Sequence, residues 1–214
     1  MTNDEIQRKL LDVHWRVRNL ITDSHLMDTS SWNAGGAIVD LANDVTPQDY
    51  DYFFSDEAVV KAWQARLSDP DPLPRTEILA KTENGITLKL DTGEVIQLVT
   101  RFIGEPSRVF DDFDYTHTKC YWRPARSPMV SGYHESELVL NRELIEGKLL
   151  RFDGHKEKFA LNTLKRFGKF VSRGWKPDND CVMNLYRAIQ KSPSIDDPEE
   201  HKRQTVGFYG SSHK

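Results

Sequence analysis

The segment from Trp32 to Phe54 constrains the fold of this chain more than any other stretch. It contains a glycine pair, Gly35-Gly36, where a short extended segment is expected to turn into a helix over residues 37–42. Glycine lets the backbone approach a ligand closely, and the unpaired amides at a helix start attract anions. The turn is therefore expected to face a phosphate-like group.

An alternation of acidic and aromatic residues follows the glycine pair. Residues 49–54 read Asp-Tyr-Asp-Tyr-Phe-Phe and predict a strand. Residues two apart in a strand share a face, so Asp49 and Asp51 would lie about 7 Å apart, with Tyr50 and Tyr52 on the other side. Paired carboxylates suit Mg²⁺, a hard cation that brings a triphosphate with it. The alternative is a solvent-exposed strand, since motif matches carry false positives.

The two features together resemble the signature of nucleotidyltransferases of the DNA polymerase β superfamily, with Asp49 thirteen residues after Gly36. The chain is similar to the catalytic head of tRNA nucleotidyltransferases (CCA-adding enzymes and bacterial poly(A) polymerases) and to small nucleotidyltransferase-like proteins of bacteriophages. Those enzymes read Gly-Gly-x-x-Arg-Asp here. In this chain Asp40 matches and Val39 replaces the arginine. The resemblance implies that Gly35, Gly36 and Asp40 contact the nucleotide.

The same resemblance implies a third carboxylate in a hydrophobic setting on a neighbouring strand. Asp114 stands between two aromatic residues and fits this position, and Asp112 is the alternative because it would share a face with Asp114. Lys119 follows in a segment that resembles the phage group, and alternation would place it on the face opposite Asp114 unless a bulge intervenes. Asp49, Asp51 and Asp114 would then be the catalytic residues and the ligands of two Mg²⁺ ions.

A basic amphipathic helix is expected over residues 159–175, ended by a glycine near its C-terminus. It resembles the neck helix of tRNA nucleotidyltransferases, where an Arg-x-x-Arg-Phe run precedes a glycine and an aromatic residue. Arg166 and Lys169 match this run, with lysine for the second arginine. They are candidates for triphosphate contacts, and the alternative is a solvated helix face. Arg101 is a further basic candidate.

The remaining pattern predicts an α+β chain. Apolar spacing and capping residues indicate helices over 3–23, 56–67 with Ser55 as its cap, 135–147 and 179–191, and a short helical turn over 106–110. Alternating segments with Asn-Gly and Thr-Gly turns indicate strands over 77–81, 86–90 and 95–101. We expect a polymerase β-like head, a mixed β-sheet flanked by helices, over residues 1–150. A short helical, neck-like extension with a polar tail would follow over residues 151–214.

The composition of the chain indicates its cellular location. It has no apolar run near the ~18 residues of a membrane helix, and its first residues show no secretory signal. Two cysteines give neither a disulfide framework nor a zinc pattern. We therefore expect a cytoplasmic protein without a membrane partner. A net charge of −4 does not favour a general nucleic-acid binder, although local basic patches remain compatible with one.

The resemblance implies a Mg²⁺-dependent enzyme that moves a nucleoside monophosphate from an NTP to a hydroxyl group, with RNA or tRNA as the first acceptor candidate. A protein-modifying enzyme (AMPylator-like or toxin-like) and a catalytically silent nucleotide-binding module are the alternatives. The Glu-Asp-x-x-Arg motif that reads CTP and ATP bases in tRNA nucleotidyltransferases is not found, and residues 178–180 offer only Asp-Asn-Asp. The base, the acceptor and the oligomeric state stay open.

Overall fold

The computed structural model describes residues 1–22, 24–71, 73–124, 136–153, 160–192, 197 and 199. The chain divides into two compact units. The first unit comprises Met1–Val109 and Cys120–Leu140, and the second unit comprises Phe110–Lys119 and Asn141–Lys214. The functional boundary expected at residue 150 stays a prediction, and most of the expected polar tail lies outside the described residues.

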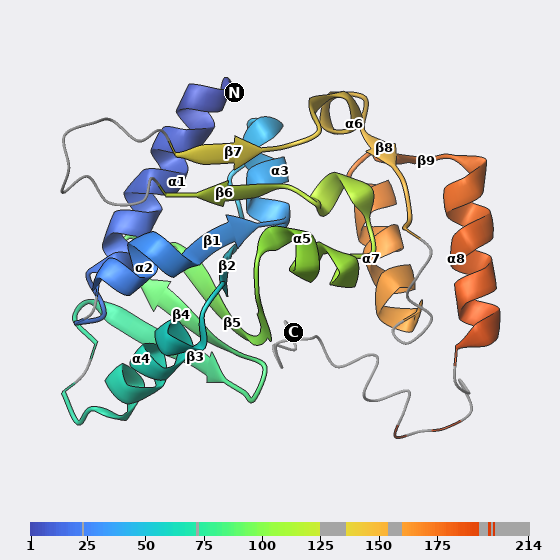
Figure 1. The fold of residues 1–214 in the computed structure, drawn as a ribbon. Helices are drawn as coiled ribbons and strands as arrows, with labels where there is room; N and C mark the ends of the chain where they lie inside the picture. The colour runs from blue at the N-terminus through green and yellow to red at the C-terminus, as the bar shows by residue number, and fades with distance from the viewer. Residues whose placement is uncertain are drawn as a thin grey trace. The chain divides into compact units, whose positions relative to one another are not determined.

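The first unit is built on a mixed β-sheet. Among the described residues, seven strands form it in the order β3-β4-β5-β2-β1-β6-β7 (Figure 1). Strand β2 runs parallel to β5, and all other neighbours are antiparallel. The expected mixed sheet flanked by helices is confirmed. The strands are β1 (Ser31–Ala34), β2 (Tyr50–Phe54), β3 (Thr76–Lys81), β4 (Gly85–Leu90), β5 (Val95–Ile103), β6 (Tyr121–Arg123) and β7 (Glu137–Val139).

Helices of the first unit pack against the face of the sheet that carries Tyr52. The ring of His14, in the first helix, lies 6.1 Å from Tyr52 and 5.6 Å from Trp122. Tyr52 and Trp122 are fully buried there. The opposite face of β2 carries Asp51 together with the buried Phe53, which stacks on Trp32. The helices of this unit are α1 (Asn3–Arg18), α2 (Ser24–Ser30), α3 (Gly36–Ala42), α4 (Glu57–Ser68) and α5 (Pro106–Val109).

The N-terminal helix is shorter than the sequence predicts. A capping box between Thr2 and Glu5 starts α1, and Asn19 ends it by donating its backbone N–H to the Trp15 carbonyl at 3.3 Å. Leu20 and Ile21 continue the apolar spacing and are buried, although they lie outside the helix. The expected helix over 3–23 is therefore wrong in its last turn, because apolar spacing reports burial and not the backbone path.

Two other boundaries differ from the prediction. The cap of α4 is Asp56, whose carboxylate accepts from the backbone N–H of Ala58 at 2.8 Å, and not Ser55. The expected helix over 135–147 is replaced by β7 and the short helix α6 (Arg142–Glu146), while Glu135 lies outside the described residues. Pairing with β6 overrides the local helix preference of this segment.

The second unit is mostly helical. The expected basic helix is confirmed as α7, which is followed by Gly174 at φ 85°, and its expected first residue, Phe159, lies outside the described residues. The expected last helix is confirmed as α8, capped by Asp178. The elements are the 3₁₀ turns η1 (Phe110–Asp112) and η2 (Thr116–Thr118), then α6, β8 (Leu149–Leu150), α7 (Ala160–Ser172), β9 (Lys176–Pro177) and α8 (Asn179–Lys191).

No helix within the described part of the chain is long and apolar enough to cross a membrane.

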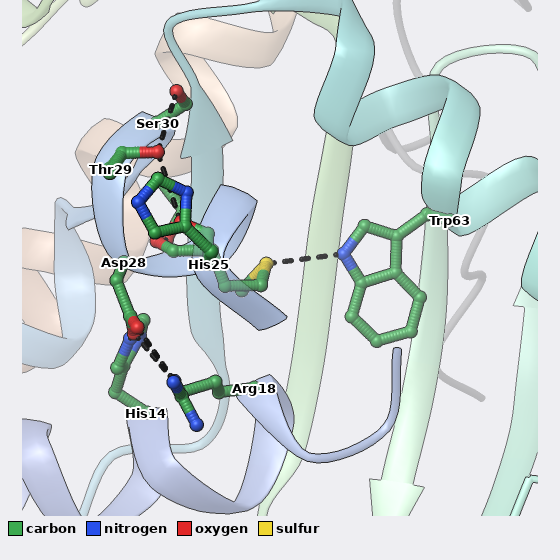
Figure 2. Close-up of polar contacts among 9 residues, drawn as sticks. His14, Arg18, His25, Asp28, Thr29, Ser30 and Trp63 are labelled. Carbon is green, nitrogen blue, oxygen red and sulfur yellow. Dashed lines mark hydrogen bonds and ion pairs between the residues drawn. The ribbon is translucent and has the colours of Figure 1, made fainter. Parts of the chain in front are cut away.

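A partly buried polar cluster ties α1 to α2 on the helical side of the first unit. Figure 2 shows the Asp28 carboxylate facing His14 and Arg18. Its Oδ2 accepts from Arg18 Nε at 2.7 Å, and its Oδ1 lies 3.2 Å from His14 Nε2. Burial alone would raise the pKa of Asp28, but hydrogen bonds from His14 and Arg18 outweigh it and lower that pKa. Asp28 is therefore an anion in the folded chain, and its bonds to His14 and Arg18 hold α2 against α1.

We expect Asp28→Ala to lower the free energy of unfolding by about 2–3 kcal/mol at pH 7, because it leaves a buried imidazole and a guanidinium without their acceptor. Urea denaturation measures this value. Asp12→Ala is the matched control, since Asp12 is 64% exposed and its ion pair with Arg16 spans one helical turn. The control should change stability by about 0.5 kcal/mol or less. Equal losses in both variants would contradict the role given to Asp28.

Candidate active site

The acid pair lies where the sequence predicts it. Asp49 immediately precedes β2, and Asp51 is its second residue, in register with Ala34 of β1 and Gln97 of β5. Both acids are half-buried, whereas Tyr52 is fully buried on the other face. The predicted alternation is confirmed. The two carboxylates share one face of the first unit's sheet.

Gln97 joins this pair and was not expected from the sequence. Its Nε2 donates to Asp49 Oδ2 at 2.7 Å, and the residue is only 5% exposed. One signal could have indicated it: a polar side chain stands among apolar neighbours in the predicted strand 95–101. A buried polar residue in a strand needs a partner, and here that partner is an acid of the pair.

The glycine pair forms the expected turn between β1 and α3. Gly35 has φ 79° and ψ −134°, a conformation that is essentially restricted to glycine, and its N–H donates to the Cys120 carbonyl at 3.2 Å. Gly36 is exposed, and a Cβ added there would meet no atom within 4 Å. The turn therefore leaves open space above its backbone. Asp40 lies half-buried on α3, five residues after Gly35.

The strand next to the glycine turn is held to the acid pair by a side-chain bond. Asn33 of β1 is 1% exposed, and its Nδ2 donates to the backbone carbonyl of Asp51 at 3.2 Å. Together with the register of β1 on β2, this bond fixes the main chain at Asp51. The position of the Asp51 carboxylate is therefore set by buried residues of the first unit.

Asp114 belongs to the second unit and has a different setting from the one predicted. It lies between η1 and η2 and not in a strand, so the expected shared face with Asp112 is wrong; Asp112 is exposed within η1. Asp114 Oδ2 accepts from Thr163 Oγ1 at 2.9 Å and from Arg166 at 2.6 Å. The carboxylate is 5% exposed. The structure thus brings Asp114 and Arg166 together.

The two candidate lysines are also in the second unit. Lys119 forms an ion pair with Asp153, and both side chains are partly exposed. The alternation that would set Lys119 opposite Asp114 is wrong, because η2 interrupts the extended chain between them. Lys169 is exposed on α7. Arg101, in the first unit, is exposed near Asn84.

An aromatic cluster surrounds His117 in the second unit. Its ring lies 3.8 Å from that of Trp175 and 4.4 Å from that of Phe170, and the residue is 1% exposed. Neither ring nitrogen has a hydrogen-bond partner among the described residues. Burial lowers the pKa of His117 to about 3. The imidazole is therefore neutral in the folded chain at neutral pH, which suits a packing role.

This lowered pKa predicts an acid-sensitive fold. The unfolded chain binds a proton at His117 near its ordinary pKa of about 6.5 and the folded chain does not, so stability is lost as pH falls below that value. The loss from this residue should reach about 2 kcal/mol at pH 5. Urea unfolding of the wild type and His117→Phe at pH 7.5 and pH 5 measures it. The variant should lose less stability on acidification, and an equal loss in both proteins would refute the assignment.

Some residues of the first unit have the oxygen atoms that a divalent cation binds. Within the described ranges, no group of three or more histidine, cysteine, aspartate or glutamate side chains is placed to hold a metal ion. Asp49 and Asp51 nevertheless share a face, and the buried Gln97 adds an amide oxygen beside them. Carboxylate and amide oxygens are the ligands that Mg²⁺ prefers.

The fold is that of CCA-adding enzymes. The Thermotoga maritima CCA-adding enzyme complexed with tRNA matches with a TM-score of 0.58 at 16% identity, over 94% of this chain and 51% of that chain. CCA-adding enzyme structures with CTP and with ATP each match with a TM-score of 0.59 at 16% identity, over 94% of this chain and 46% and 45% of theirs. This chain thus spans about half the length of these enzymes. At this identity the likeness shows the fold alone.

The sequence itself identifies a family. The model of the family described as Gabija anti-defense 2 family protein (Gad2) matches residues 7–142, more than half of the 214 residues. The chain therefore belongs to the Gad2 family. No curated protein matches the sequence. The matched region contains the glycine pair, the acid pair and Gln97, and it ends before α7.

Proposed function

We propose that this chain is a Mg²⁺-dependent nucleotidyltransferase that moves a nucleoside monophosphate from an NTP to a hydroxyl group. The observation that carries the proposal is the placement of Asp49 and Asp51 on one sheet face, with β1 and its glycine turn alongside. The fold shared with CCA-adding enzymes supports it. Open space over Gly36 supports a close approach of phosphate to the backbone.

Asp49 and Asp51 would hold Mg²⁺, and Asp114 is the proposed third carboxylate of a two-ion site. The ions would neutralise the triphosphate and favour ionisation of the acceptor hydroxyl. The hydroxyl oxygen forms a bond to the α-phosphorus and loses its proton, while the bond between the α-phosphorus and the bridging oxygen breaks. Pyrophosphate leaves with that oxygen. Gly35, Gly36 and Asp40 would line the nucleotide site.

The hydrogen bonds of Asp114 within the second unit limit how it could bind a metal ion. Asp114 is bonded to Thr163 and Arg166, so ligation of a metal ion by Asp114 requires its carboxylate to share or release these donors. Arg166, Lys119 and Lys169 are the proposed triphosphate contacts. Of these, Arg166 and Lys169 are exposed on α7.

RNA is the acceptor that the charge distribution favours. Between Ala160 and Pro177 the sequence has five cationic residues and no acidic one. These residues are Lys165, Arg166, Lys169, Arg173 and Lys176. Such a cationic segment suits a polyanionic acceptor, because lysine and arginine supply most of the affinity for phosphate backbones.

A protein acceptor is the second candidate, and the family description favours it. The Gad2 family is named for anti-defense against Gabija. Attachment of a nucleotide to a component of that defence would be a direct way to block it. Under this alternative the acid pair keeps its role and only the acceptor changes.

Incubation of the full chain with each α-³²P-labelled NTP, Mg²⁺ and either total RNA or a cell lysate tests the proposal. We expect label on RNA, lost with EDTA and falling steeply as salt rises. Label on a protein would move the assignment to the second candidate. Absence of label on either acceptor, with all four NTPs, would contradict nucleotidyl transfer.

A further inference from the structure

Gln97 is a buried polar residue beside the acid pair, and it has no role in the reaction proposed above. It lies on β5, the strand parallel to β2, and its backbone is in register with Asp51. Its side chain contacts Asp49, so it shares the sheet face of both acids. All three residues belong to the first unit, and their arrangement follows from the sheet alone.

The orientation of the Gln97 amide is set by chemistry. An ionised carboxylate only accepts hydrogen bonds, so the atom that faces Asp49 Oδ2 at 2.7 Å must be the amide nitrogen. The amide oxygen, Oε1, belongs to the same side chain and therefore lies on the same face of the sheet as the two acids. It is buried, and no described residue donates a hydrogen bond to it. A buried acceptor left in this way is unfavourable unless another group binds it.

The sheet thus carries two carboxylates and a buried amide oxygen without a donor on one face, and all three groups offer oxygen atoms of the kind that hard cations bind. We propose that Gln97 is a metal ligand: its Oε1 completes, with Asp49 and Asp51, a site for one divalent cation of the Mg²⁺ or Mn²⁺ class. The amide is neutral, so the set carries a formal charge of −2. Hard cations bind such oxygen sets, with affinity that rises with the number of charged ligands.

The use of this cation in catalysis rests on the proposed function, but the binding of the cation does not. A simpler role for Gln97 would be to position Asp49 through the hydrogen bond at 2.7 Å. The two roles differ in the effect of adding a charge. A ligand that becomes a carboxylate should bind the cation more tightly, whereas a positioning amide that becomes a carboxylate would lose its bond to Asp49 and repel it.

Mn²⁺ binding to the full chain, followed by electron paramagnetic resonance without nucleotide, separates the two roles. We expect Gln97→Glu to tighten Mn²⁺ binding about tenfold and Gln97→Leu to weaken it by a similar factor. Gln64→Glu is the matched control, because it adds the same charge at an exposed site on α4 and should leave the affinity unchanged. Circular dichroism checks that each variant is folded.

Tighter binding in Gln97→Glu alone supports the inference even if Gln97→Leu fails to fold. Unchanged or weaker Mn²⁺ binding in Gln97→Glu would overturn it, as would equal tightening in Gln64→Glu. Nucleotide transfer is measured separately on the same proteins. If Mn²⁺ affinity changes with the residue at position 97 but no variant transfers nucleotide, the proposed function is refuted and the cation site stands. If the protein transfers nucleotide but its Mn²⁺ affinity is the same in all Gln97 variants, only the cation site is refuted.

Discussion

Asp49→Asn and Asp51→Asn are each expected to reduce nucleotide transfer about a thousandfold, which corresponds to about 4 kcal/mol of activation free energy. Each change keeps the shape of the side chain and removes one negative charge from the face of β2. Catalysis of phosphoryl transfer rests on positioning and on neutralising the triphosphate, and both depend on the cation that the pair would hold. Initial rates with α-³²P-labelled NTP measure the effect.

The fold should survive both substitutions, because Asp49 and Asp51 are half-buried and asparagine keeps the size of each side chain. Asp12→Asn is the matched control: it removes a charge from an exposed residue on α1. The control should transfer nucleotide at the wild-type rate. A wild-type rate in Asp51→Asn, with its fold intact, would remove the acid pair from the mechanism.

Asp114→Asn is expected to reduce transfer about a hundredfold, or about 2.7 kcal/mol, if Asp114 acts as the third carboxylate. The rate could also fall because the substitution weakens the hydrogen bonds that Asp114 accepts from Thr163 and Arg166. Arg166→Gln separates the reasons. It breaks the ion pair from the other side, and the arginine side chain is 47% exposed, so the variant should fold.

We expect Arg166→Gln to reduce transfer about tenfold, by loss of a triphosphate contact, and so far less than Asp114→Asn. Urea unfolding of both variants shows whether either loss reflects the stability of the second unit. Equal losses of rate in the two variants, at equal stability, would assign Asp114 to holding Arg166 and remove it from the metal site.

The sequence predicted those parts of the fold that depend on neighbouring residues. The turns at Asn84-Gly85 and Thr92-Gly93 marked the hairpins of β3, β4 and β5, and the acidic-aromatic alternation placed the side chains of β2 on the correct faces. The basic residues of α7 and Gly174, which follows it, marked that helix in the same way. In each case the local pattern and the tertiary structure agree.

The errors lie where distant residues decide the structure. Helix α2 has seven residues, of which Met27 is buried, so it has no apolar period to detect. Strand β7 forms because Leu138 pairs across from Trp122 of β6. No local window contains that pairing, and tertiary pairing overrides helix preference.

The candidate site shows the same division. The acid pair is local and was predicted, whereas Gln97 joins it only through the parallel register of β5 on β2. Parallel neighbours are separated by a long crossover, so the sequence gives no direct indication of which residues face each other. Asp114 was placed by an analogy of pattern, and the structure replaces its expected strand with two 3₁₀ turns.

The proposed reaction moves the nucleoside monophosphate of an NTP, with its α-phosphate, to the acceptor and releases pyrophosphate. Parallel reactions with α-³²P-labelled and γ-³²P-labelled NTP, Mg²⁺ and the same acceptor preparation test it most directly. The account predicts acceptor label from the α-labelled NTP only, with the γ-label recovered in pyrophosphate. Acceptor label from the γ-labelled NTP, or inorganic phosphate as the released product, would contradict it.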